Sequence, residues 1–116
     1  MERYERDRSD AQIRDGLIQR FEFTYELSHK ILKRYLEATS PTPDQYHMMP
    51  FQDIIRSGNE QSLLLGDWPS WKGYRDMRAK TIHTYDAASA LQVVENLPAF
   101  IREAEYLCDQ VQRRTQ

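Results

Sequence analysis

The sequence has very few of the residues that build cross-links, tight turns and membrane segments. Among its 116 residues there is one cysteine, Cys108, and there are only four glycines. A single cysteine excludes an internal disulfide and a thiolate-rich metal site, and it suits a reducing cytosol. No apolar run approaches the length of a membrane-spanning helix, and the charged start Met1–Arg8 is unlike a signal peptide. We therefore expect a cytoplasmic protein without a membrane segment.

An excess of charge of one sign is also lacking. Sixteen Lys and Arg residues against eighteen Asp and Glu residues give a formal net charge of −2. Without an overall positive field, any contact with nucleic acid must be local. The sequence has no glycine-rich phosphate loop, and His29, His47 and His83 show none of the spacings of a zinc site. We expect neither a bound metal nor a cofactor.

What the sequence does have is helical periodicity along its whole length. From about Asp10 to Ala38, apolar residues fill more than half of the helical circumference, and the polar residues, Glu26 and Lys30 among them, form one solvated arc. Such a helix needs cover on two sides, and a second subunit is the natural cover for one of them. Arg20 lies toward the apolar arc. It either reaches solvent or a neighbouring carboxylate, or it lies at an interface or lines a site.

The remaining two thirds of the sequence predict shorter helices with short connections. The expected elements are a capped turn at Thr42–Gln45, a helix from about Pro50 to Arg56 ended by Ser57-Gly58, a helix from Asp67 to about Lys80, and two helices divided by Asn96-Leu97-Pro98. Trp68 and Trp71 are expected in the core, with stacking on a base as the alternative. The predicted fold class is all-α: a single domain over residues 1–116, an antiparallel bundle of about five helices with a four-helix up-and-down core, assembled as a homodimer.

One segment gathers a fixed cation, a group that titrates near neutral pH and a phenol. Arg78, His83 and Tyr85 lie within eight residues of one another. On one continuous helix, a five-residue separation rotates His83 about 140° away from Arg78. The two can cooperate only if the helix ends between them or if a second copy of the chain supplies the missing partner. Thr81 and Thr84 disfavour a helix, so we expect Arg78 on the last helical turn and His83 and Tyr85 in the connection.

An arginine and a histidine without a metal suit phosphodiester chemistry on RNA. Histidine can take the proton of a 2′-hydroxyl group or return one to the leaving oxygen, and arginine can hold the phosphate. Arg75 and Lys80 nearby would add local positive potential. One histidine cannot easily serve both sides of an in-line displacement, whereas a two-fold dimer that juxtaposes two such segments can. The alternative is a structural histidine at a helix end.

Two stretches of the sequence also match a known pattern. The first runs from Arg14 to Leu27 and continues through Lys33, and the second is Arg78–His83 followed by Tyr85. The first resembles the first long helix of the HEPN family, and more closely of its branch called nucleotidyltransferase substrate-binding proteins. The second resembles the R-x4-H-x-Y segment of that family. The resemblance covers most of the chain, from about residue 14 to residue 111.

The resemblance implies a helical homodimer encoded beside a minimal nucleotidyltransferase, in a toxin–antitoxin-like pair. The helical protein of such a pair can be a metal-independent endoribonuclease. Carried over to this sequence, Arg78 would bind phosphate and His83 would be the acid and base at the dimer cleft. Tyr85 would accept AMP from the transferase, which would silence the cleft.

One departure from the family pattern keeps other functions open. Family ribonucleases commonly carry Asn directly after the arginine, where this sequence has Ala79. The loss of that hydrogen-bonding group favours the main alternative, a non-catalytic subunit that binds a nucleotide or substrate for the transferase. A third alternative is an interaction domain in which Arg78 and His83 only tie helix ends together.

Overall fold

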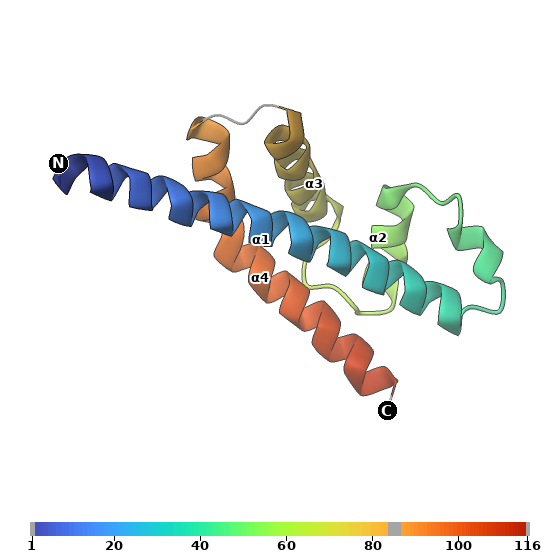
Figure 1. Ribbon diagram of the computed structural model, residues 1–116. Helices are drawn as coiled ribbons and strands as arrows, with labels where there is room; N and C mark the ends of the chain where they lie inside the picture. The colour runs from blue at the N-terminus through green and yellow to red at the C-terminus, as the bar shows by residue number, and fades with distance from the viewer. Residues whose placement is uncertain (1, 84–86, 116) are drawn as a thin grey trace.

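The computed structural model describes residues 2–83 and 87–115, and this part of the chain consists of helices and their connections, without a strand (Figure 1). The elements are α1 (Glu2–Thr39), the short 3-10 helix η1 (Pro43–Tyr46), α2 (Phe51–Glu60), α3 (Trp68–His83) and α4 (Ala87–Arg114). The predicted all-α fold class is confirmed. Within the described ranges, no helix combines the length and the apolar character needed to cross a bilayer.

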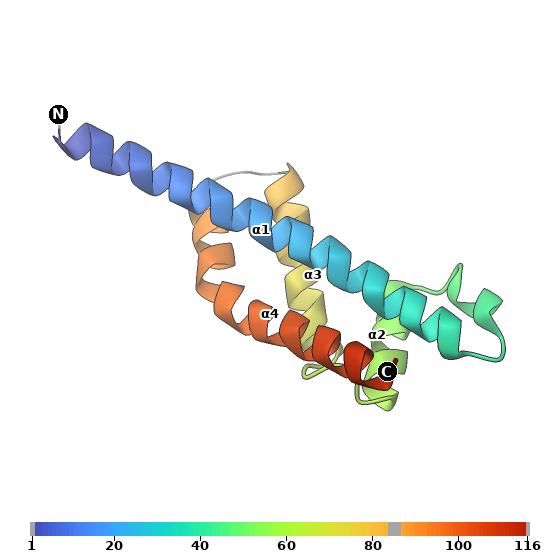
Figure 2. The same cartoon turned by 60° about the horizontal axis from the view of Figure 1, so that its bottom comes forward.

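Helix α1 is longer than the sequence pattern indicated. It begins at Glu2 instead of near Asp10, and it has 38 residues. The first residues are mostly Glu and Arg, which are strong helix formers, and no glycine or proline precedes Gly16. The apolar pattern that located the helix starts later because the N-terminal part of α1 extends beyond the other helices (Figures 1 and 2).

Aromatic side chains from all four α-helices meet in the core. They are Phe21 and Tyr25 of α1, Phe51 of α2, Trp71 and Tyr74 of α3, and Phe100 of α4. The ring centroid of Phe100 lies 5.0 Å from that of Phe21 and 4.9 Å from that of Tyr74, in edge-on geometry. Trp71 is buried and Trp68 packs partly buried against this cluster, so the prediction that both tryptophans belong to the core is confirmed. The cluster fixes α3 against α1.

The most extensive packing in the fold is between α1 and α4, and these two helices run in the same general direction. Ile13 and Leu17 lie beside Leu91 and Val94, while residues 20–28 lie beside residues 101–108. Figure 2 shows both helices passing from left to right along the chain. The expectation of a regular up-and-down core, with antiparallel neighbours, is therefore wrong for this pair. This parallel arrangement is possible because α3 leads the chain from the end of α2 back to the side of the molecule where α4 begins (Figure 2).

A proline and a glycine that we expected to end helices lie inside them. Pro98 lies within α4, so the two predicted C-terminal helices are one, which changes direction along its length instead of breaking (Figure 2). Gly58 lies within α2, which continues to Glu60. A β-carbon at Gly58 would come 3.0 Å from Leu64 and 3.2 Å from Leu32, so the glycine provides room for close packing and not a helix end.

The turn after α1 forms, but without the side-chain cap that we expected. Pro43 occupies the first turn of η1 as predicted, while the side chain of Thr42 makes no capping hydrogen bond. Ser40 Oγ stabilises the turn in another way: it accepts hydrogen bonds from the backbone N–H of Thr42 at 3.0 Å and from Gln45 Nε2 at 3.2 Å.

Candidate functional site

Arg78 projects from α3 toward α1, where two neighbouring side chains hold its guanidinium group. Nη2 of Arg78 donates a hydrogen bond to Oε1 of Glu26 and forms an ion pair with it. The guanidinium carbon also lies 5.5 Å from the centroid of the Tyr25 ring, in a cation–π contact. The arginine side chain is 29% exposed. A half-buried, oriented guanidinium of this kind is suited to binding a phosphate.

Glu26 was assigned from the sequence to a solvated face, and the structure corrects this. Its carboxylate crosses to α3 and binds Arg78, which lies 52 residues away in the chain. The sequence pattern suggested only the local pair with Lys30, because periodicity reports neighbours on one helix and not contacts between helices.

His29 lies one helical turn beyond Glu26, and its ring packs edge-on against Phe51 with 4.6 Å between ring centroids. Burial lowers the pKa of His29, and the positive charges of Lys33 and Arg78 lower it further. The neutral form of this imidazole is therefore favoured. The same α1 surface thus presents an aromatic ring, a carboxylate and a neutral histidine beside Arg78.

The structure does not place His83 where the sequence predicted it. Helix α3 runs without interruption through His83, so positions 78 and 83 belong to one helix and are separated by about 140° around its axis. Good packing of α3 onto the core outweighs the weak helix propensity of Thr81. The side chain of His83 lies outside the described residues, and so does the whole of Tyr85. Their predicted roles stay predictions.

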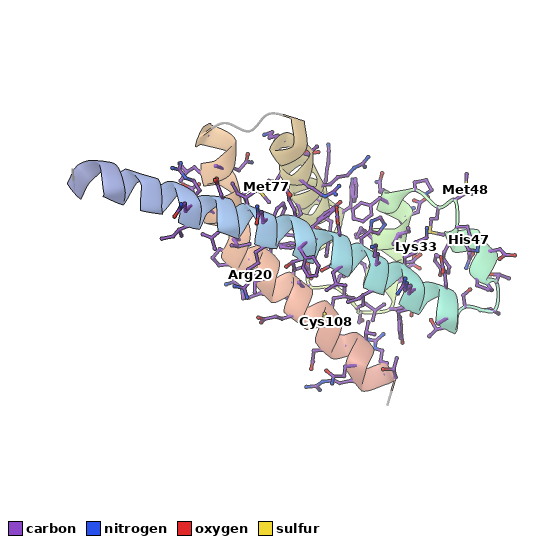
Figure 3. The ribbon with its side chains drawn as sticks, viewed as in Figure 1. Arg20, Lys33, His47, Met48, Met77 and Cys108 are labelled. Carbon is purple, nitrogen blue, oxygen red and sulfur yellow. The ribbon has the colours of Figure 1, made fainter. Side chains whose placement is uncertain are left out.

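Three further basic residues were predicted near the site, and they lie in different places. Arg75 is exposed one turn before Arg78 on α3, and its charge acts on Tyr25. Lys80 donates a hydrogen bond to Gln92 Oε1 of α4 at 3.3 Å, so it lies on another side of α3 from Arg78. Arg20 lies at the groove between α1 and α4 (Figure 3).

Two shallow grooves run along the side where α1 meets α4. We call this side the α1/α4 face. The first groove, of about 260 Å³, is lined by Ile13, Arg14, Leu17, Leu91 and Val94. The second, of about 240 Å³, is lined by Arg20, Thr24, Leu27, Ser28, Ile101, Ala104, Glu105 and Cys108. Ile13, Leu27 and Leu91 are each more than 40% exposed, so this face presents apolar side chains that the protomer itself leaves uncovered.

The described residues contain no group of three or more His, Cys, Asp or Glu side chains arranged to hold a metal ion. The groups that the described site brings together are an arginine, a carboxylate, a tyrosine ring and an imidazole whose neutral form is favoured.

Comparison with known proteins identifies the fold and the family. The chain superposes with a TM-score of 0.80 on a solved Haemophilus influenzae structure described as revealing the fold of a substrate-binding domain of a nucleotidyltransferase. The sequences are 39% identical, and the match covers 87% of this chain and 74% of the other. A Haemophilus influenzae (strain ATCC 51907 / DSM 11121 / KW20 / Rd) sequence called probable ribonuclease HepT is 41% identical over 101 residues, which are 87% of this chain and 68% of that sequence.

The fold is therefore that of the helical nucleotidyltransferase substrate-binding domains. Residues 1–113 match the family model described as nucleotidyltransferase substrate binding protein like. The chain belongs to this family, and the family resemblance predicted from the sequence is confirmed.

Proposed function

We propose that this chain is the helical partner of a minimal nucleotidyltransferase in a toxin–antitoxin-like pair, and that its homodimer is a metal-independent endoribonuclease. Two descriptions found by comparison support this proposal: a substrate-binding domain of a nucleotidyltransferase and a probable ribonuclease. Arg78 is the phosphate-binding residue and His83 is the acid and base.

The observation that carries the proposal is the unbroken helix between Arg78 and His83. Because positions 78 and 83 are separated by about 140° around the axis of α3, we do not expect one protomer to direct both side chains at the same phosphate. A second copy can supply the missing group. The uncovered apolar residues of the α1/α4 face support such a dimer, since a surface of this kind is typical of an interface.

The proposed reaction uses the two histidines of the dimer on opposite sides of the phosphate. The imidazole of one His83 takes the proton of the 2′-hydroxyl group, and the 2′-oxygen attacks phosphorus. The bond from phosphorus to the 5′-oxygen breaks, and the imidazolium of the other His83 protonates that leaving oxygen. Arg78 stabilises the negative charge that develops on the phosphate oxygens. The products are a 2′,3′-cyclic phosphate and a 5′-hydroxyl end.

Ala79 supports a second candidate, a non-catalytic subunit that binds a nucleotide for the transferase. Ala79 is exposed directly after Arg78 and offers no hydrogen-bonding group there. In this case the purified chain binds ATP or AMP and leaves RNA intact.

The proposal is tested with purified protein, a labelled single-stranded RNA and EDTA. The wild-type chain is expected to cleave the RNA and leave cyclic phosphate ends, and His83→Ala is expected to lower the rate by about 10²- to 10⁴-fold. His47→Ala is the matched control, because His47 lies in the exposed turn after η1 and pairs there with Asp44 and Glu37. Undiminished cleavage by His83→Ala would reject the role of this residue.

The second arm of the experiment adds the neighbouring transferase and ATP. We expect the mass of the chain to rise by AMP units on Tyr85 and cleavage to fall in step, because a bulky anion two residues from His83 repels RNA phosphates. Tyr85→Phe should take up no AMP. Tyr106→Phe is the control, since Tyr106 lies on α4 and donates its hydroxyl proton to the backbone of Ser62. Equal labelling of Tyr85→Phe would show that the acceptor lies elsewhere.

A further inference from the structure

Glu26 binds Arg78 directly, and nothing in the sequence pattern assigned it a role. Its carboxylate accepts the hydrogen bond from Nη2 of Arg78, and the neighbouring Tyr25 ring lies against the same guanidinium. Both come from consecutive positions of α1. The carboxylate itself is about half exposed, so solvent and ligands reach this pair.

The two contacts together determine how the guanidinium is oriented. A guanidinium group is planar, and its N–H donors have fixed directions in that plane. Glu26 fixes one edge of that plane and Tyr25 limits its tilt. The arginine is therefore presented in one direction, and the enzyme does not have to order a long side chain when the phosphate reaches its transition state.

The negative charge of Glu26 has a second and opposite effect. A phosphate that approaches Arg78 also approaches this carboxylate, and the two like charges repel each other. Glu26 thus weakens the binding of any polyanion at Arg78 while it improves the geometry of the arginine. Substituting a residue that only stabilises the fold should weaken RNA binding and slow cleavage together. Substituting Glu26 should instead strengthen binding and slow cleavage.

We propose that Glu26 is a positioning residue for Arg78, which orients the guanidinium for phosphodiester cleavage at the expense of tight RNA binding in the ground state. This inference rests on the proposed ribonuclease function. It adds a residue of α1 to the proposed site. It also predicts that Glu26 weakens the binding of RNA while it raises the rate of cleavage.

A purely structural role for this ion pair is disfavoured by its surroundings. Helices α1 and α3 already pack through buried residues, among them Tyr25, Trp71 and Met77. An ion pair between a half-exposed carboxylate and a partly exposed arginine adds little to the stability of such an interface.

The test compares Glu26→Ala and Glu26→Gln with Glu60→Gln. The control removes the same charge from the exposed end of α2. RNA affinity is measured in the His83→Ala background, where the RNA stays intact, and single-turnover cleavage is measured with His83 present. Both Glu26 variants are expected to bind RNA several-fold more tightly. Glu26→Ala should cleave at least tenfold more slowly, while Glu26→Gln, whose amide oxygen still accepts the hydrogen bond, should keep most of the rate. Glu60→Gln should resemble the wild type in both measurements.

Each result decides between the inference and its rivals. Wild-type cleavage rates in Glu26→Ala overturn the inference and leave the proposed function intact. Weaker RNA binding together with slower cleavage in Glu26→Ala indicates a loosened fold, and it also overturns the inference. A wild-type chain that cleaves no RNA overturns the proposed function, and the positioning role falls with it.

Discussion

A neutral histidine beside a fixed arginine makes stability depend on pH. The pKa of His29 in the folded chain lies below the reference value of 6.5, because of burial first and of Lys33 and Arg78 next. The unfolded chain therefore binds a proton at this residue more readily than the folded chain does. The contribution of neutral His29 to stability is present above about pH 6.5 and is lost as the pH falls through the folded pKa.

We expect the free energy of unfolding of the wild type to decrease between about pH 7 and pH 5, and this decrease to be smaller in His29→Gln. Urea unfolding followed by circular dichroism over a series of pH values measures the difference. His47→Gln is the control, because His47 is exposed between two carboxylates and is not buried against an aromatic ring. Parallel pH profiles for the wild type and His29→Gln would contradict the assigned cause.

At the scale of residues, the sequence identified part of the candidate site. Arg78 was found because it stands close to His83 and Tyr85 in the chain. Glu26 and His29 were missed as partners because they approach Arg78 only when α1 and α3 pack together. Local spacing carries no information on which faces of two helices meet.

At the scale of elements, a buried carboxylate holds the connection between α2 and α3. Glu103 of α4 is 2% exposed. Its two carboxylate oxygens accept hydrogen bonds from the backbone N–H groups of Leu65, at 2.6 Å, and Gly66, at 2.7 Å. A β-carbon at Gly66 would lie 2.8 Å from this carboxylate, so only glycine allows the approach. The connection is thereby fixed at the start of α3, the helix that carries Arg78.

Glu103→Gln is expected to lower the free energy of unfolding by about 2 kcal/mol. The amide keeps one accepting oxygen, but its NH₂ group faces the second backbone N–H, so one buried donor loses its partner. Urea denaturation measures the change. Glu95→Gln, on an exposed position of the same helix, should change stability by no more than about 0.5 kcal/mol. An equal and small effect of both substitutions would show that water replaces the carboxylate.

Helix existence could be predicted from the sequence, whereas several helix ends could not. Apolar spacing located every long helix, because one buried stripe per helix is what the core requires. Gly58 and Pro98 misled the prediction because their local preference for a helix end is outweighed by tertiary packing. The sequence also did not predict that α1 and α4 run in the same direction. The length of a connection does not specify how α3 crosses the bundle between them.

At the scale of the whole molecule, α1 has more apolar surface than one protomer covers. Phe21, Leu32 and Leu36 are buried in the core, while Ile13, Phe23 and Leu27 remain exposed. The sequence predicted this division from the width of the apolar arc, and the structure describes which residues lie on each side. A second copy of the chain covering the α1/α4 face is part of the proposed function, because Arg78 and His83 need a partner copy to act on one phosphate.

Leu91→Glu and Leu27→Glu are therefore expected to convert dimers into monomers. Each places a charge on an apolar groove of the α1/α4 face, which should raise the dimer dissociation constant at least about tenfold while the core stays intact. Sedimentation velocity distinguishes the 13.8 kDa protomer from a particle of twice that mass. Met48→Glu is the matched control, because Met48 is 92% exposed and lies in neither groove.

Cleavage should fall in proportion to the dimer fraction, because the arginine of one copy and the histidine of the other must face the same phosphate. Raising the protein concentration of Leu91→Glu should restore dimer and activity together, which a damaged protomer could not do. If the wild type sediments as a monomer at every concentration and still cleaves RNA, the shared cleft is wrong. Arg78 would then have to act with a base from its own chain, and His29, whose pKa the charge of Arg78 lowers, would be the first residue to substitute.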